Sequence, residues 1–401
     1  MGRRIPMSWR ATSPMSERVK FIGMCLGGGR TMTGLCSEFG ISRKTGYKWL
    51  NRYKDGNLDG LKEQSRAPRS HPNVTDPRVE AKLLAARKKH PTWGPKKLLW
   101  RLHQEGIRPH LPAASTAWAI LKRHGLVEAR RRRRPRDGSS APGMGMTRPN
   151  EVWCADYKGQ FKTKDGLYCY PLTVSDGYSR YLVSCRGLRD TGTEGARPVF
   201  ERAFRDYGLP WRLRTDNGSP FASTGLARLT ALSVWMIKLG IELERIQPGH
   251  PEQNGRHERM HRTLKRETVV PPAGDLRAQQ RRFDRFRREY NEERPHEALG
   301  QRPPGSVYER SPRPYPRSIE DYEYPAHYEV RKVSGFGTFP FRMHAIYANE
   351  CLNGERLGLV EIDDGIWRVH FRGHELGIVD ERQLRRTKRI GYGKVLPMCP
   401  I

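Results

Sequence analysis

Apolar residues recur at helical spacing near the start of the chain, where they predict three short helices within residues 16–54. The first, SERVKFIGMCLGG, has an apolar face and a Ser N-cap, and it stops at the glycines 27–29. MTGLCSEF forms the second, and SRKTGYKWLNRYKDG begins at the capping residue Ser42, after a turn that contains Gly40. A helix, a tight turn and a basic helix predict a helix-turn-helix module; an ordinary three-helix bundle is the alternative.

The same plan recurs in residues 76–125, where DPRVEAKLLAARKKHP, GPKKLLWRLHQEG and PAASTAWAILKRHGLV each have the pattern of a helix. We interpret this segment as a second DNA-binding module, although the two segments are too dissimilar to be a sequence repeat. Polar residues of the last helix in each module are the ones expected to reach DNA. These are Arg43, Lys44, Thr45, Tyr47 and Lys48 in the first module, and Ser115, Thr116, Lys122 and Arg123 in the second.

From Asn150 onward the pattern changes to strands. EVWCADYKGQF alternates, and YCYPLTVSDGYSRYLVSCRGL predicts two strands folded around Asp-Gly. The helix GTEGARPVFERAFRDYG, the strand WRLRTD, the helix ARLTALSVWMIKLG and the strand LERIQP follow, and two long helices begin within HPEQNGRHERMHRTLKRE and DLRAQQRRFDRFRREYNEER. Hairpin strands followed by alternating helices and strands predict a mixed α/β sheet. This order is compatible with a ribonuclease-H-like fold and also with other α/β arrangements.

The last part of the chain is β-rich again. Short alternating strands joined by Gly turns predict a small β-barrel after a proline-rich stretch. The chain is therefore expected to be multidomain, with N-terminal all-α helix-turn-helix modules, a central α/β core and a C-terminal small β-barrel. The expected division is 1–62 and 75–128 for the helical modules, 129–149 for a basic linker, 150–300 for the α/β domain, 301–325 for a connector, 326–386 for the barrel and 387–401 for a tail.

Charge indicates the partner. The chain of 401 residues has a formal net charge of +31, which favours a polyanion such as nucleic acid over a merely soluble surface. A run of arginines within 129–149 cannot pack in a core and suits the phosphates of DNA, with a solvated tether as the alternative. It consists of Arg130, Arg131, Arg132, Arg133 and Arg134.

Several other partners are not expected from the sequence. Seven scattered cysteines without a C-x-x-C pair indicate reduced thiols in a cytoplasmic compartment. No apolar run of membrane-spanning length and no secretory segment is present, so neither a membrane span nor export is expected. No G-x-x-x-x-G-K-[ST] motif is present, so no nucleotide cofactor is expected either.

Three acids of the α/β region, Asp156, Asp216 and Glu258, form the candidate site and are called the acidic triad below. Asp156 lies in the first strand and Asp216 at the end of the strand WRLRTD, so adjacent strands would bring them side by side. A helix packed across the strand ends would bring Glu258 to them. Carboxylates that meet repel one another unless cations neutralise them, and hard oxygen ligands suit Mg²⁺ or Mn²⁺, here as two ions. Each acid taken alone also has a purely structural explanation.

The residues around the acids resemble a known family. WCADYKG, RTDNGSPF and HPEQNGRHERMHRTLK resemble the catalytic blocks of DDE transposases and retroviral-type integrases, most closely bacterial insertion-sequence transposases with an integrase core. The third block, P-x-Q-N-G-x-x-E-R-x-H-x-x-L-K, is the most specific. ISRKTGYKWL, HPTWGPKKL and YNEERPHEALGQRPP are similar to the same group, so the resemblance covers essentially the whole chain. It implies that the acidic triad is catalytic and holds metal, and that the loop containing Asn254 touches the DNA end.

The resemblance implies a function. The chain would bind double-stranded DNA at the ends of a mobile element as a homo-oligomer, hydrolyse the phosphodiester there and join the 3′-OH ends to target DNA in a bacterial cytoplasm. Two alternatives are a catalytically inactive DNA-binding regulator of the element and a ribonuclease-H-like nuclease without joining activity. The helix that bears Glu258 supports the reading independently, because Arg262 and Lys265 share its face, although a surface ion pair would give the same spacing.

The sequence departs from the retroviral-type cores in two respects. The stretch between Asp216 and Glu258 is longer, and the extra length falls in ASTGLARLTALSVW, where it would lengthen a loop or helix without moving the blocks. The zinc-binding N-terminal module of retroviral integrases is also replaced by the helix-turn-helix modules.

Overall fold

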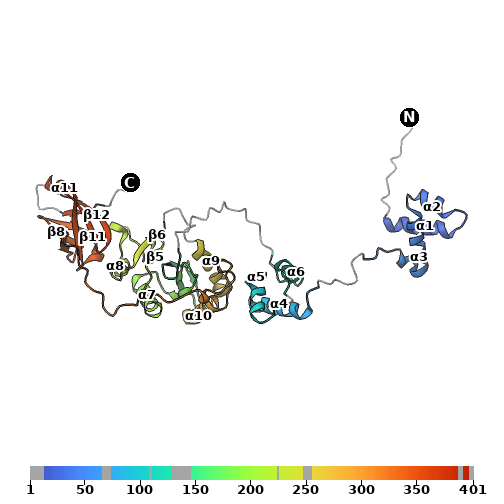
Figure 1. Ribbon diagram of the computed structural model, residues 1–401, viewed down its shortest axis with the longest axis horizontal. Helices are drawn as coiled ribbons and strands as arrows, with labels where there is room; N and C mark the ends of the chain where they lie inside the picture. Colours follow the sequence, from blue (N-terminus) through green and yellow to red (C-terminus); the bar gives the residue numbers. More distant parts are fainter. Residues whose placement is uncertain are drawn as a thin grey trace, which may run out of the picture. The chain divides into compact units, whose positions relative to one another are not determined.

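The computed structural model describes residues 13–65, 74–107, 111–128, 146–223, 225–246, 255–386 and 392–396. The chain divides into two compact units, Met1–Val74 and Thr75–Ile401 (Figure 1). The predicted arginine run 130–134 and Asn254 lie outside the described residues.

The first unit contains a three-helix module. It consists of α1 (Pro14–Leu26), α2 (Met32–Glu38) and α3 (Arg43–Gly60). The Ser42 side chain caps α3 by accepting a hydrogen bond from Thr45 N, and Gly40 takes a positive φ of 62° in the turn before it, as the sequence predicts. Phe21, Leu35 and Trp49 are buried in the core. The helix α1 begins earlier than predicted, because the Ser13 side chain caps it and a proline suits its first turn.

The second unit begins with another three-helix module, formed by α4 (Pro77–Lys89), α5 (Pro95–Gln104) and α6 (Ala114–Arg123). Leu83, Trp93, Leu98, Leu102 and Ile120 are among its buried residues. Polar contacts join this module to the α/β domain that follows: His90 Nδ1 lies 2.8 Å from Glu289 Oε1, and Lys96 Nζ lies 2.6 Å from Glu297 Oε1. The module therefore contacts the α/β domain through side chains, in addition to its covalent connection along the chain.

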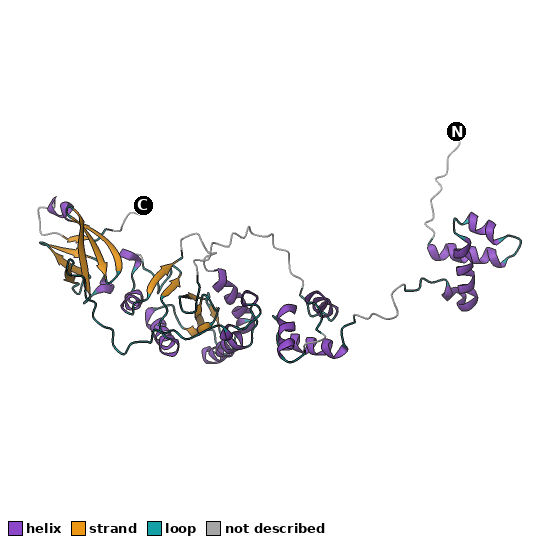
Figure 2. Ribbon diagram, in the orientation of Figure 1, coloured by secondary structure: helices purple, strands orange, loops and turns teal. Residues whose placement is uncertain are grey.

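The α/β domain is built on one mixed sheet, as predicted (Figure 2). Its strands are β1 (Val152–Tyr157), β2 (Phe161–Lys162), β3 (Tyr168–Asp176), β4 (Leu182–Leu188), β5 (Arg212–Thr215) and β6 (Glu242–Arg245). They run in the order β2-β3-β1-β5-β6, and β4 pairs with β3. The strand β1 is antiparallel to β3 and parallel to β5, so the two strands predicted to carry Asp156 and Asp216 are neighbours.

Helices cover both faces of this sheet. Its helical elements are α7 (Thr193–Tyr207), η1 (Leu226–Arg228), α8 (Ala231–Lys238), α9 (Gly255–Leu264), η3 (Lys265–Val269) and α10 (Leu276–Glu292). Trp153 and Ala155 of β1 pack with α7 and α8 on one face. Cys185 of β4 packs with Met260 of α9 and Phe283 of α10 on the other. Since side chains alternate along a strand, Asp156 points away from Ala155 and toward the α9 face.

The C-terminal region contains two small sheets on one core. One has the order β12 (His374–Asp380), β11 (Ile366–Phe371), β10 (Arg356–Asp363), β7 (Glu329–Lys332), and the other β13 (Tyr392–Lys394), β9 (His344–Tyr347), β8 (Thr338–Phe341). Neither sheet closes into a barrel within the described residues, so the predicted small β-barrel is not confirmed. The expected tail also needs correction, because β13 pairs with β9 and Val395 is buried in the core. The strand is only three residues long, too short for the alternation of the sequence to reveal it.

The C-terminal region packs on the α/β domain at α8 and the segment before it, where the sequence analysis expects a stretch longer than in retroviral-type cores. Leu229, Val234 and Ile237 from that longer stretch and α8 lie in the same apolar cluster as the C-terminal strands. Lys238 Nζ lies 2.5 Å from Glu355 Oε1 at the edge of this contact. These residues therefore build an interdomain surface. Within the described residues, no helix has the length and apolar content needed to cross a bilayer.

Candidate active site

The strands β1 and β5 bring Asp156 and Asp216 to the same level of the sheet. Ala155 is the register partner of Thr215 in this parallel pair. Asp156 directly follows Ala155, and Asp216 directly follows Thr215. Asp216 follows β5 in a turn, where Gly218 N donates to its Oδ1 at 3.2 Å. A Cβ atom at position 218 would lie 3.1 Å from Asp216 Oδ2, so glycine there leaves room for the carboxylate. Asn217 Nδ2 donates to Ile246 O at 2.9 Å and ties the turn to the chain after β6.

The helix α9 carries the third acid on its exposed side. Met260 and Leu264 bury its apolar face against β4 and α10. Glu258 and Arg262 of α9 are exposed, and so is Lys265, the first residue of η3. The helix therefore lies across the sheet with its acid and bases open to a ligand.

The charges of the acidic triad interact. The pKa of Asp156 is raised to about 7. Burial is the largest cause, the negative charges of Asp216 and Glu258 add to the rise, and Lys158 opposes it. The pKa of Asp156 is thus raised because its charged form loses hydration and meets other carboxylates. A divalent cation would relieve the repulsion between the carboxylates. Carboxylate oxygens are hard ligands, which suit Mg²⁺ or Mn²⁺.

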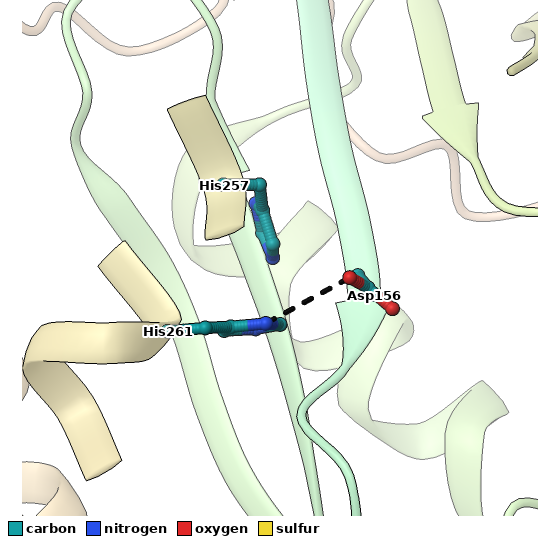
Figure 3. A group of neighbouring side chains, drawn as sticks. All are labelled: Asp156, His257 and His261. Atoms are coloured by element: carbon teal, nitrogen blue, oxygen red, sulfur yellow. Dashed lines mark ion pairs between the residues drawn. The ribbon is translucent and has the colours of Figure 1, made fainter. Parts of the chain in front are cut away.

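Two histidines that the sequence prediction missed lie beside Asp156. His257 and His261 come from the buried side of α9, and Figure 3 shows both rings turned toward Asp156 on β1. One ring nitrogen of each histidine and a carboxylate oxygen of Asp156 lie within 4.8 Å of one another, so the three residues could hold a metal ion. Burial lowers the pKa of His257 to about 3 and that of His261 to about 2, so both rings are neutral at physiological pH.

Hydroxyl groups of β3 hold these histidines. Thr173 Oγ1 lies 2.7 Å from His257 Nε2 and 2.6 Å from His261 Nε2. Ser175 Oγ lies 2.9 Å from His257 Nδ1. The i,i+4 spacing of the histidines was the sequence signal that could have revealed a shared buried face. The threonine partner has no local signal, because strand pairing alone brings it opposite Asp156.

The predicted DNA-contacting residues of the first module lie on α3. Arg43, Lys44, Tyr47 and Lys48 are exposed, whereas Thr45 is half-buried beside the cap at Ser42. Trp49 is buried and Leu50 is partly buried in the module's core, as expected. An exposed basic surface therefore surrounds the start of α3.

The predicted residues of the second module lie on α6. Ser115, Thr116, Lys122 and Arg123 are all exposed. The Arg123 guanidinium is engaged, because its Nη2 lies 2.8 Å from Glu80 Oε1 of α4. Lys122 Nζ lies 5.2 Å from the centre of the Trp118 ring, which is itself exposed. The exposed side of α6 therefore combines an aromatic ring with polar residues.

Comparison with family models places known domains on these elements. A model of the integrase core domain matches residues 146–251, and a second integrase core model matches residues 239–304. A helix-turn-helix domain model matches residues 17–69, and a homeodomain-like domain model matches residues 45–121. The chain carries an integrase core preceded by helix-turn-helix domains. The integrase core model ends within the segment before α9, and the second model continues through α9 and α10.

Insertion elements encode proteins similar to this chain. The uncharacterized 31.7 kDa protein of insertion element IS407 from Burkholderia multivorans is 31% identical over 190 residues, which are 45% of this chain and 64% of that protein. The uncharacterized 39.2 kDa protein of IS476 from Xanthomonas euvesicatoria is 27% identical over 289 residues, 69% of this chain and 78% of that one. The chain thus spans slightly less than two thirds of the first relative. The resemblance to insertion-sequence proteins with an integrase-like core is confirmed.

Integrases are among the solved structures that match part of this chain. The catalytic core domain of HTLV-2 integrase in complex with magnesium is 17% identical, with a TM-score of 0.33, and the match covers 41% of this chain and 99% of that one. Together the family models confirm the predicted helix-turn-helix helices and the ribonuclease-H-like integrase core.

Proposed function

We propose that this chain is a DNA transposase that cuts the ends of an insertion sequence and joins them to target DNA. The integrase core and the insertion-element relatives support a role in DNA recombination. The single observation on which the catalytic assignment rests is the parallel register of β1 and β5, in which Asp156 and Asp216 directly follow the paired residues Ala155 and Thr215. Such a cluster of carboxylates is stable only with cations or protons.

The acidic triad would hold Mg²⁺ or Mn²⁺, as two ions in the complete site. Such ions supply Lewis-acid stabilisation of the phosphodiester and of the attacking and leaving oxygens. Asp156 and Asp216 would face the scissile phosphate from the sheet, and Glu258 from α9. Arg262 and Lys265, exposed beside Glu258, would bind neighbouring phosphates. Water would then hydrolyse each element end, and the freed 3′-OH would attack target DNA by transesterification.

The helical modules would read the element ends. The exposed polar residues of α3 and α6 are the proposed contacts, with Arg130–Arg134 following the backbone and Asn254 at the DNA end. We also propose the domain division 1–62, 75–128, 129–149, 150–300, 301–325 and 326–386, the last as a small β-barrel. Because two ends must be joined together, the chain would act as a homo-oligomer on DNA, in the bacterial cytoplasm and associated with the nucleoid.

A strand-transfer assay tests the proposal. A labelled element-end duplex and target DNA are incubated with the full chain and Mg²⁺, and joined and nicked products are separated. We expect joined product from the wild type and none from Asp216→Ala. Asp364→Ala, an exposed acid in the β10–β11 turn, is the matched control and should join normally. Joining by Asp216→Ala would refute the site, nicking without joining would indicate a nuclease, and DNA binding without any product would indicate an inactive regulator.

A further inference from the structure

The hydroxyl of Thr173 determines which nitrogens of His257 and His261 carry hydrogen. Thr173 Oγ1 lies 3.1 Å from the backbone oxygen of Asp156, in addition to its contacts of 2.7 Å and 2.6 Å with the two Nε2 atoms. A hydroxyl has one hydrogen to donate, and a carbonyl oxygen can only accept. The contact with Asp156 O uses this hydrogen, and in that arrangement both imidazoles donate to Thr173 through Nε2–H.

The remaining nitrogens are consequently lone-pair acceptors. A neutral imidazole carries a single N–H, and these rings are buried, with exposed fractions of 2% for His257 and 5% for His261. His257 Nδ1 is used, because Ser175 Oγ lies 2.9 Å away and can donate to it. His261 Nδ1 instead faces Asp156 Oδ2 at 3.7 Å (Figure 3). An acceptor nitrogen therefore faces a carboxylate oxygen at a distance longer than a hydrogen bond.

We propose that His261 Nδ1 is a nitrogen ligand of the cation that Asp156 holds, so that this position prefers a first-row transition metal to Mg²⁺. The inference rests on the proposed function in assigning a cation to Asp156. His261 Nδ1 and Asp156 Oδ2 lie 3.7 Å apart, so the two atoms would have to approach one another to bind the same ion. Imidazole nitrogen binds transition metals much better than Mg²⁺, which demands oxygen.

Hydrogen bonding orients the ligand for this role. A metal-binding histidine usually donates its other N–H to an oxygen acceptor, which fixes the tautomer and the ring. The Nε2–H of His261 donates to Thr173, and Thr173 is itself fixed by the Asp156 backbone. His257 lacks a comparable free lone pair, because both of its nitrogens already contact hydroxyl groups. The two histidines of one helix face therefore have different roles, His261 as ligand and His257 as support.

Mn²⁺ is the probe for the test, since pulsed electron paramagnetic resonance detects a directly bonded ¹⁴N. The tag-free full chain is compared with His261→Gln and His257→Gln. Glutamine keeps an amide N–H near the position of Nε2, so the contact with Thr173 is retained while Nδ1 is removed. Thermal unfolding followed by circular dichroism establishes that each variant is folded. Calorimetric titration with Mn²⁺ and with Mg²⁺ gives the preference between the two ions.

We expect ¹⁴N coupling in the wild type and in His257→Gln, and its loss in His261→Gln. The Mn²⁺ affinity of His261→Gln should fall roughly tenfold, with Mg²⁺ affinity nearly unchanged. Coupling that persists in His261→Gln, or Mn²⁺ bound without coupling in the wild type, would overturn the assignment. The proposed function is tested separately from the histidine ligand. It is retained, even where the histidine assignment fails, if the wild type joins DNA and Asp156→Asn does not bind Mn²⁺. Absence of both Mn²⁺ binding and joining would refute the two together.

Discussion

Two acids at opposite ends of the β1–β3 ladder have very different surroundings. Asp176 is the register partner of Trp153, and Asp156 is the register partner of Thr173. Asp176 is 1% exposed and accepts hydrogen bonds from Asn150 N at 2.7 Å, Ser179 N at 2.7 Å and Ser179 Oγ at 2.6 Å. Asp156 instead has other carboxylates as neighbours. Burial raises the pKa of both acids, and the donors around Asp176 oppose that rise.

The difference teaches that burial of an acid does not by itself identify a catalytic site. The Asp176 carboxylate accepts hydrogen bonds from protein groups and stabilises the turn that contains Ser179. At the Asp156 end the charges of Asp216 and Glu258 add to the effect of burial on the pKa of Asp156, while Lys158 opposes them, and this arrangement creates a place for cations. Substitutions at the two ends should therefore have opposite consequences for activity and for stability.

The largest expected effect is on activity. Asp156→Asn, which removes a proposed metal ligand, should lower strand transfer by about 10³-fold or more, a loss of several kcal/mol of transition-state stabilisation. Asp176→Asn should retain activity within about tenfold once the rate is normalised to folded protein, because its carboxylate serves the fold. Strand-transfer rates measured with the fraction folded test this pair. Equal losses in both variants would remove the distinction between the two ends.

The second effect concerns stability and has opposite signs at the two ends. Asp176→Asn places an amide where Ser179 donates, and it should destabilise the protein by ~2 kcal/mol. Asp156→Asn removes a charge held among other carboxylates, and it should stabilise the metal-free protein by ~2 kcal/mol at pH 7.5. Denaturant unfolding in the presence of a chelator measures both. Destabilisation by Asp156→Asn would mean that its charge is favourably solvated in the folded protein.

The contrast also explains what the sequence alone could predict. Hydrophobic periodicity predicted the strands and the helix that carry Asp156, Asp216 and Glu258, and the resemblance to DDE transposases and integrases implied that these three acids act together. Periodicity carries no information on side-chain partners across strands. Thr173 was therefore missed, although it contacts both histidines.

Other misses have the same physical cause, since they depend on long-range pairing. The strand β13 forms only because β9 offers it an edge, and its three residues have no pattern of their own. The attachment of the α4–α6 module to the α/β domain depends on contacts such as His90 with Glu289, far apart in the sequence. Local elements were predictable here, and contacts between distant elements were not.

A third effect is the pH dependence of the metal-free protein. The pKa of Asp156 is raised from 3.8 to about 7 in the folded state, so between those values the folded protein binds more protons than the unfolded chain. Its stability should therefore fall as pH rises through this window, and Asp156→Asn should reduce the fall. Saturating Mg²⁺ should restore stability at pH 7.5, because a cation replaces the proton. Melting temperatures from pH 5 to pH 8 with and without chelator test this, and a wild-type profile parallel to that of Asp156→Asn would contradict it.

The smallest expected effect lies at the start of η3, directly after α9. Lys265 is exposed and, among the described residues, takes part in no ion pair, so Lys265→Gln should reduce the salt slope of DNA binding by about one and weaken binding a few-fold. Lys96→Gln is the matched control, because Lys96 Nζ already pairs with Glu297 at 2.6 Å and its charge is largely compensated. Binding titrations of an element-end duplex over a range of salt concentrations measure both slopes. An equally large change of slope in Lys96→Gln would mean that DNA binding depends on the net charge of the chain. The exposed bases beside Glu258 would then have no specific role in binding the phosphates.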